Sequence, residues 1–222
     1  MATGDPQDLV AKIRRSVLDG RFAAGQRLVE SELCELYDVS RATVRQALRE
    51  LVADGLVEVQ RNKGARVRTI STAEAVEITE VRRALEGLLA AKAAERVTPE
   101  QAERLLEIKA AMREKVAAHD PLAYSNLNAS LHALVQEIAG QTTARTILSR
   151  LQGQIVRHQF RLSLQPGRSL VSLGQHERIV DAIVARDPEA AEAAMRAHLD
   201  DVISQISAFA KPHAEPAVPA PW

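Results

Sequence analysis

The chain has 222 residues, of which 46% are hydrophobic and 3% aromatic, and its 29 basic side chains balance 29 acidic ones. Such a chain can bury a substantial core and is longer than one small domain requires, so we expect two domains. The scarcity of aromatic side chains argues against the stacking platforms with which proteins bind single-stranded nucleic acid.

The charges are unevenly distributed along the chain. Residues 1–70 carry 12 basic and 10 acidic side chains, whereas residues 71–222 carry 17 and 19, and residues 40–70 alone carry 7 and 3. Cys34 is the only cysteine, so no internal disulfide can form, and no stretch approaches 18 uninterrupted apolar residues. The N-terminal segment has no apolar signal core. We therefore expect a cytoplasmic protein that does not span a membrane.

Two helices joined by a short turn are predicted near the N-terminus. In the first, residues 29–37, we expect Leu33 and Leu36 to face inward. The second begins at Ser40, whose hydroxyl can cap the unpaired amides of the first turn. Gly55 is placed to end this helix in the left-handed conformation.

The second of these helices has two distinct faces. Apolar side chains recur at the helical period and predict one buried stripe, made of Val44, Leu48, Leu51 and Val52. Arg41, Arg45 and Arg49 stand four residues apart on another face and are expected in solvent. Such a face is either an ordinary solvated surface or a DNA-reading surface.

A two-stranded hairpin is predicted after the second helix. Residues 56–59 read as one strand, residues 62–64 as a tight turn and residues 65–68 as the returning strand. Basic side chains crowd this hairpin, namely Arg61, Lys63, Arg66 and Arg68. Two helices and a basic hairpin indicate a winged helix-turn-helix, whose second helix presents its N-terminal residues to base edges in the major groove of duplex DNA. The candidate contacts at that end are Ser40, Arg41, Ala42, Thr43 and Arg45, because Arg can pair with guanine, Ser and Thr can reach bases or phosphates, and a methyl group can touch thymine.

The remainder of the chain predicts helices without strands. Their expected ranges are 73–97, 99–118, 121–139, 142–164, 170–186 and 188–209. Thr98 and Asp120 each precede a proline and are expected to cap the helix that follows. The fold class is therefore mostly α: a winged helix-turn-helix over residues 1–70, then an all-α antiparallel helical bundle over residues 74–210. Residues 211–222, rich in proline, are expected to be disordered.

Histidines form the second informative pattern. Asn128 and His132 are four residues apart on one predicted helix, so they project from the same face, and His176 and His198 lie on two later helices. If the three helices converge, three imidazoles and one amide oxygen would suit zinc, nickel or a similar divalent ion, with positions open for water or a ligand. From spacing alone, each histidine can equally be a hydrogen-bonded or exposed side chain.

The first 70 residues resemble the DNA-binding domain of the GntR superfamily of bacterial transcription regulators. The resemblance is carried by IRRSVLDGRFAAGQRLVESELCELYDVSRATVRQALRELVADGLVEVQRNKGARV. It implies that this family's DNA contacts fall at Ser31, Ser40, Arg41, Ala42, Thr43, Arg45 and Gly64. Arg49, from the arginine face, and Lys63, from the hairpin turn, complete the set of candidate DNA-binding residues. The family usually has a proline where Thr43 stands.

The second domain resembles the FCD effector-binding domain of the FadR branch, through EVRRALEGLLAAKAAERVT, NASLH and QHERIVDAIVARDPEAAEAAMRAHL. In that family an Asp-x-x-x-His pair and two later histidines hold a divalent metal. The resemblance assigns these places to Asn128, His132, His176 and His198, with Asn128 standing where the family has aspartate. A neutral Asn leaves the ion its full double charge, which strengthens its pull on an anion.

Arg82 occupies the arginine of the family's R-x-x-L-E motif, which commonly points toward the effector cavity. There it could pair with a carboxylate that also binds the metal. Alternatively, Arg82 forms an intrahelical ion pair with Glu86, four residues on.

These expectations combine into a homodimeric transcription regulator that binds a palindromic operator in double-stranded DNA and responds to a small carboxylate held beside a divalent metal. A metal-dependent hydrolase with an appended DNA-binding domain is the alternative, because three histidines can activate water. Its general base would have to be Glu177, which should face away from an ion bound by His176. A DNA-architectural protein without an effector would leave the histidines without a role.

Overall fold

A computed structural model describes residues 5–18, 20–60, 64–163 and 165–208, and within these ranges the chain divides into two compact units. The first comprises residues up to 70 together with residues 146–157, and the second comprises residues 71–145 and those from 158 onward. Residues 146–157 therefore group with the first unit, although the sequence pattern places them in the helical domain. The expected disordered tail and the candidate DNA contact Lys63 lie outside the described residues.

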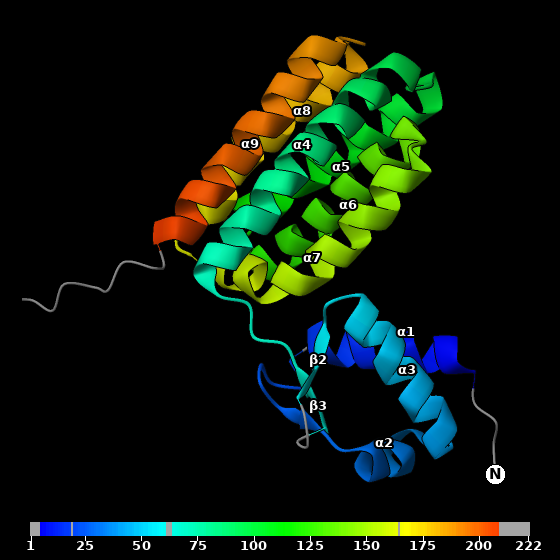
Figure 1. The fold of residues 1–222 in the computed structure, drawn as a ribbon. Helices are drawn as coiled ribbons and strands as arrows, with labels where there is room; N and C mark the ends of the chain where they lie inside the picture. Colours follow the sequence, from blue (N-terminus) through cyan, green and yellow to red (C-terminus); the bar gives the residue numbers. More distant parts are fainter. Residues whose placement is uncertain (1–4, 19, 61–63, 164, 209–222) are drawn as a thin grey trace, which may run out of the picture. The chain divides into compact units, whose positions relative to one another are not determined.

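The part of the first unit up to residue 70 combines helices with a small sheet (Figure 1). Its elements are α1 (Pro6–Leu18), β1 (Arg27–Leu28), α2 (Glu30–Tyr37), α3 (Arg41–Ala53), β2 (Val57–Gln60) and β3 (Gly64–Val67). The sheet has the order β1-β3-β2 with antiparallel pairing. Across the β2–β3 ladder, Glu58 faces Arg66 and Val59 faces Ala65. This is the expected winged helix-turn-helix, with β1 as a third strand that the sequence pattern does not reveal.

The core of the first unit confirms most of the predicted buried positions and corrects two. Val44, Leu48 and Leu51 are buried on α3, and Leu33 is buried on α2. Leu36, however, is 63% exposed and Val52 38% exposed. The expected inward direction of Leu36 is wrong, because α2 packs on the core through Leu33, Cys34 and Tyr37, and Leu36 lies to one side of that face.

Helix boundaries in both units follow the predicted capping residues. Ser40 Oγ accepts a hydrogen bond of 3.1 Å from the Thr43 amide at the start of α3, and Gly55 has φ +71° just after its end. Thr98 and Gln101 form a capping box, and Asp120 Oδ1 accepts from the Ala123 amide at 2.9 Å. These caps supply partners to amides that the helix itself leaves unpaired.

The second unit is built on helices (Figure 1). The helices after β3 are α4 (Thr72–Arg96), α5 (Pro99–Ala117), α6 (Pro121–Ala139), α7 (Thr142–Ser163), α8 (Arg168–Val184) and α9 (Pro188–Ala208). Helix α4 packs against α6, α8 and α9, while α5 packs against α6 and α8. Four helices, α4, α6, α8 and α9, are thereby brought together around one core. Among the described residues, no helix is both long and apolar enough to cross a membrane.

Candidate functional site

The exposed face of α3 carries the three arginines that the sequence predicts. Arg41, Arg45 and Arg49 are all exposed, on the side of the helix opposite its buried stripe. The Arg45 guanidinium Nε donates to both carboxylate oxygens of Glu30, at 2.9 and 3.1 Å, and the Arg45 side chain remains 59% exposed. A pair this exposed is weak, so Arg45 can leave Glu30 for a phosphate or a base at little cost.

The other candidate DNA contacts differ in accessibility. Ser31 and Ala42 are exposed, and Gly64, at the start of β3, is exposed with φ +78°. Thr43 is buried, and its hydroxyl bonds to the Ser40 hydroxyl at 2.8 Å. The Thr43 hydroxyl therefore supports the start of α3 together with the Ser40 cap.

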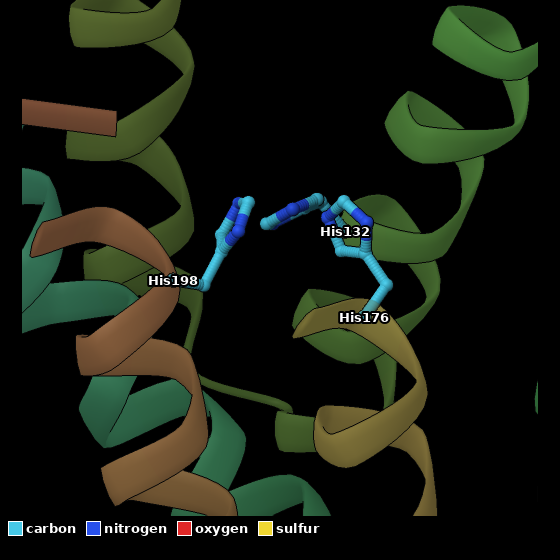
Figure 2. Close-up of side chains that lie close together, drawn as sticks. All are labelled: His132, His176 and His198. Atoms are coloured by element: carbon cyan, nitrogen blue, oxygen red, sulfur yellow. The ribbon is translucent and has the colours of Figure 1, made fainter. Parts of the chain in front are cut away.

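Three histidines meet inside the second unit. His132 on α6, His176 on α8 and His198 on α9 are each less than 9% exposed, and one ring nitrogen of each lies within 4.8 Å of the others. Figure 2 shows their three imidazole rings turned toward a common space between the helices. The sequence analysis stated the convergence of these three helices only as a condition for a metal site. In the fold, the three helices do converge.

Each of these imidazoles has a hydrogen-bond partner at Nδ1. His132 Nδ1 lies 2.7 Å from Glu86 Oε2, and His198 Nδ1 lies 2.8 Å from Gln175 Oε1. An ionised carboxylate and an amide oxygen only accept, so these two rings carry a proton on Nδ1 and keep the Nε2 lone pair free. His176 Nδ1 lies 3.0 Å from the hydroxyl of Tyr124.

Among the polar side-chain atoms that are buried without a hydrogen-bond partner in the described part of the chain are His176 Nε2, Asn128 Oδ1 and Arg82 Nη1. Arg82 is linked to the cluster through Glu86, which contacts His132. Asn128 lies one turn before His132 on α6, as the spacing predicts. Buried polar atoms are almost always paired, so an imidazole nitrogen, an amide oxygen and a guanidinium nitrogen left without partners are candidate contacts for a ligand. Two of the three suit a divalent cation, and the third suits an anion.

The Arg82–Glu86 ion pair predicted as the alternative role of Arg82 is formed. Arg82 Nε and Nη2 lie 2.8 and 2.7 Å from Glu86 Oε1, and both side chains are almost fully buried. The Nε and Nη2 atoms of the guanidinium are thereby paired with Glu86, and Nη1 is the nitrogen left without a hydrogen-bond partner among the described residues. The sequence analysis gave the Arg82–Glu86 ion pair and a contact between Arg82 and an effector as alternatives, whereas the geometry allows both.

The electrostatics favour the neutral form of two histidines of the cluster, His176 and His198. Burial, together with the nearby histidines and Arg168, holds the pKa of His176 and of His198 well below the usual value. Burial alone would raise the pKa of Glu86, but the attraction of Arg82 and His132 prevails and lowers it to about 2. Neutral imidazoles are the form that binds metal ions.

Several side chains of the network were missed by the sequence analysis. Tyr124 is buried against His176, and burial raises the pKa of its phenol well above the usual range. Arg168 is buried and pairs with Asp201 of α9. Glu86 was considered only as a partner of Arg82. A signal existed, because Tyr124 precedes His132 by eight residues and Arg168 precedes His176 by eight, which places each pair on one helix face.

Glu177, the general base that a hydrolase would need, is engaged elsewhere. Its carboxylate pairs with Arg113 of α5, on the side of α8 away from His176. The expected direction of Glu177 is confirmed, and it leaves the histidine cluster without that base.

The fold and these two sites define a transcription regulator with a winged helix-turn-helix. Family models extend this conclusion: residues 6–67 match the model described as "Bacterial regulatory proteins, gntR family", and residues 77–201 match the FCD domain. The chain therefore belongs to the GntR family of bacterial transcription regulators, in its FCD-containing branch.

Individual proteins agree with this assignment. The chain is 31% identical over 205 residues to an HTH-type transcriptional regulator in an unstable DNA locus of Streptomyces ambofaciens, covering 90% of this chain and 84% of that protein. It is 26% identical over 200 residues to the HTH-type transcriptional repressor RspR of Escherichia coli K12, covering 90% and 88%. The solved structure of E. coli McbR/YncC shares the fold, with a TM-score of 0.79 at 18% identity over 95% of this chain and 100% of that one.

Proposed function

We propose that this protein is a homodimeric, ligand-responsive transcription regulator whose operator affinity is controlled by a small organic acid bound beside a divalent metal. The observation that carries the proposal is the cluster of three buried imidazoles, together with three buried atoms that lack a partner among the described residues: His176 Nε2 in the cluster, Arg82 Nη1, and Asn128 Oδ1 one turn before His132. Leaving such atoms unpaired costs about 1–3 kcal/mol each, so a ligand that pairs them binds with a strong preference for this site.

The residues that would hold the metal are Asn128, His132, His176 and His198. Their donors are three imidazole nitrogens and one amide oxygen, which suit zinc or nickel and leave positions for a further ligand. All four are neutral, so the bound ion would keep its double positive charge and act as an electrophilic anchor for a carboxylate. The family's aspartate would cancel one of these charges, and Asn128 does not.

Arg82 would provide the second anchor for the acid. Its Nη1 is buried and unpartnered, while Glu86 fixes the other side of the guanidinium. A guanidinium held rigidly in a site of low dielectric binds an anionic oxygen more strongly than a mobile surface arginine does. A small acid with at least two oxygens, one for the metal and one for Arg82, meets these requirements.

DNA binding in this proposal is by α3 and the hairpin of β2 and β3. The exposed arginines of α3 would reach base edges and phosphates, and a dimer would present two such helices to the two halves of a palindromic operator. RspR, to which the chain is 26% identical, is named a repressor. Repression released by the acid is the simplest form of the response.

The coupling between the sites would need only a difference in affinity between two dimer geometries. A coupling of about 1–3 kcal/mol changes operator affinity about 5- to 150-fold. The segment of residues 69–73 would transmit the change, since rotating one domain against the other alters the spacing of the two α3 helices.

The test is a thermal-unfolding screen of small organic acids, run on metal-loaded protein and on protein stripped with a chelator. An acid present at 100 times its Kd should stabilise the loaded protein by about 2.7 kcal/mol. The amide analogue of the same acid is the control, because it keeps the shape and removes the charge. If the acid stabilises stripped and loaded protein equally, or if the purified protein takes up no divalent metal, the proposal is wrong.

A further inference from the structure

Glu86 is the last residue of the R-x-x-L-E motif, and the resemblance assigns it no role of its own. Its side chain is 2% exposed, and its two oxygens face different partners. Oε1 accepts from Arg82 Nε and Nη2 of the preceding turn of α4, and Oε2 lies 2.7 Å from Nδ1 of His132 on α6. One buried carboxylate therefore touches both a candidate metal ligand and the candidate anchor of the acid.

The chemistry of the carboxylate dictates how His132 is protonated. An ionised carboxylate has no proton to donate, so the contact exists only if His132 Nδ1 carries one. A neutral imidazole with its proton on Nδ1 keeps the Nε2 lone pair free. Glu86 acts as an ionised carboxylate in both contacts, because its Oε1 is paired with the Arg82 guanidinium through Nε and Nη2.

We propose that Glu86 is a positioning residue that sets the metal-binding tautomer of His132 with one oxygen and fixes Arg82 with the other. Its role as a support for metal and acid rests on the proposed function. The proton position itself does not, because it follows from the contacts of Glu86 with Arg82 and His132. Carboxylates that orient metal-bound histidines in this way typically contribute 10- to 100-fold to metal affinity.

Arg82 makes the carboxylate irreplaceable by an amide of the same size. A guanidinium only donates, so a glutamine at this position must turn its oxygen toward Arg82. Its NH2 group then faces His132 Nδ1, which can pair with it only as an acceptor. His132 would have to move its proton to Nε2, and that nitrogen could no longer bind a metal.

The first experiment measures the tautomer of His132 by ¹⁵N NMR of the imidazole in metal-free protein near pH 7.5, with the signal assigned by its loss in His132→Gln. Wild-type protein should show the proton on Nδ1, and Glu86→Gln should show it on Nε2. Zinc affinity of Glu86→Gln should fall about 10- to 100-fold. Glu177→Gln is the matched control, because it removes one negative charge next to His176 in sequence. In this variant the tautomer of His132 and the affinity for zinc should both stay wild-type.

A double variant separates hydrogen bonding from charge. In Arg82→Leu/Glu86→Gln the glutamine oxygen is free to turn to His132, which should return the proton to Nδ1 and recover most of the lost zinc affinity. Zinc affinity alone does not separate the two causes, because the double variant also loses the positive charge of Arg82 and so regains the net charge of the wild type. The tautomer decides: a double variant with His132 still protonated on Nε2 would overturn the inference, as would a wild-type His132 protonated on Nε2.

Failure of this inference is distinguishable from failure of the proposed function. If wild-type protein takes up no metal but the tautomer switches in Glu86→Gln and returns in the double variant, the proposed function fails and the positioning role of Glu86 stands. If zinc binds to the wild type and the tautomer is unchanged in Glu86→Gln, the positioning role fails alone. The wild-type tautomer measurement decides the matter even if Glu86→Gln does not fold.

Discussion

The two units place their polar chemistry in opposite ways. In the first, the cations of α3 stand in solvent, and even the ion-paired Arg45 remains 59% exposed. In the second, His132, His176 and His198 are buried, and each Nδ1 has a specific partner. Exposed charges exchange partners at little cost, whereas buried polar groups require fixed ones.

This contrast teaches how each unit responds to substitution. An exposed arginine can be removed without disturbing its neighbours, so its loss should be visible only in binding. A buried histidine belongs to a network through which several helices are tied together, so its loss should change binding, protonation and stability at once. The predictions below test this contrast, beginning with the largest effect.

Removing one imidazole of the cluster should have the largest effect. His176→Ala should lower the affinity for zinc by more than about 100-fold, because the loss of a direct ligand exceeds the 10- to 100-fold cost of losing an outer partner. Elemental analysis after dialysis measures the bound metal. His119→Ala, at an exposed position after α5, is the control and should leave the metal content unchanged. Equal metal content in the two variants would rule out His176 as a ligand.

The fold illustrates what local sequence can and cannot predict. Ser40, Thr98 and Asp120 were predicted as caps, because a cap depends on residues within one helical turn. The strand β1 was not predicted, because it has two residues and exists only through its pairing with β3, some 40 positions later. Long-range pairing leaves no trace in the periodicity of such a short segment.

The site follows the same division. The three histidines were predicted because their spacing and the family resemblance both single them out. Their partners Tyr124 and Gln175 were not, since a hydrogen bond between helices depends on how α6, α8 and α9 pack. The sequence analysis gave Arg82 either an ion pair with Glu86 or a contact with a ligand. A sequence does not reveal that Nε and Nη2 can pair with Glu86 while Nη1 stays available for a ligand.

Next in size is the loss of an exposed arginine. Arg45→Ala should weaken operator binding by about 1–3 kcal/mol, the usual contribution of a base- or phosphate-contacting arginine, and leave thermal stability unchanged. Fluorescence anisotropy with labelled operator measures the affinity. Arg104→Ala removes the same charge from an exposed position on α5 and is the control. If both variants weaken binding equally, net charge alone and not α3 accounts for the effect.

Arg82→Leu tests the link between the units. The variant removes Nη1 but leaves the Glu86–His132 contact, so metal content and effector-free operator affinity should stay near wild-type. The effect of the acid on operator binding, about 1–3 kcal/mol in wild-type protein, should disappear, because the differential contact that shifts the equilibrium is gone. A normal response to the acid would restrict Arg82 to its ion pair with Glu86.

Stability should depend on pH through two of the buried histidines, His176 and His198. Their pKa values are lowered in the folded protein, so below the ordinary value of 6.5 the unfolded chain binds more protons than the folded one. The free energy of unfolding should therefore fall as the pH drops below 6.5, by about 1.4 kcal/mol per pH unit for each histidine that stays neutral when folded. Urea unfolding of metal-free protein between pH 7.5 and 5.5 measures this slope. His176→Gln should reduce it, whereas His119→Ala should not.

The smallest expected effect concerns Asn128, where the chain departs from its family. Asn128→Asp adds an anionic ligand to the proposed site, and the attraction to the metal is partly offset by the cost of burying the carboxylate. The net gain in zinc affinity should be about 1 kcal/mol, comparable to the difference between charged and neutral hydrogen bonds. The same carboxylate cancels one charge of the bound ion, so the acid should bind more weakly although the metal binds more tightly. Calorimetric titration with zinc and then with the acid measures both affinities. A tighter metal and a weaker acid in Asn128→Asp would mean that the neutral ligand set favours anion binding. If the acid binds both proteins equally well, the charge of the ion does not control recognition, and Arg82 alone anchors the acid.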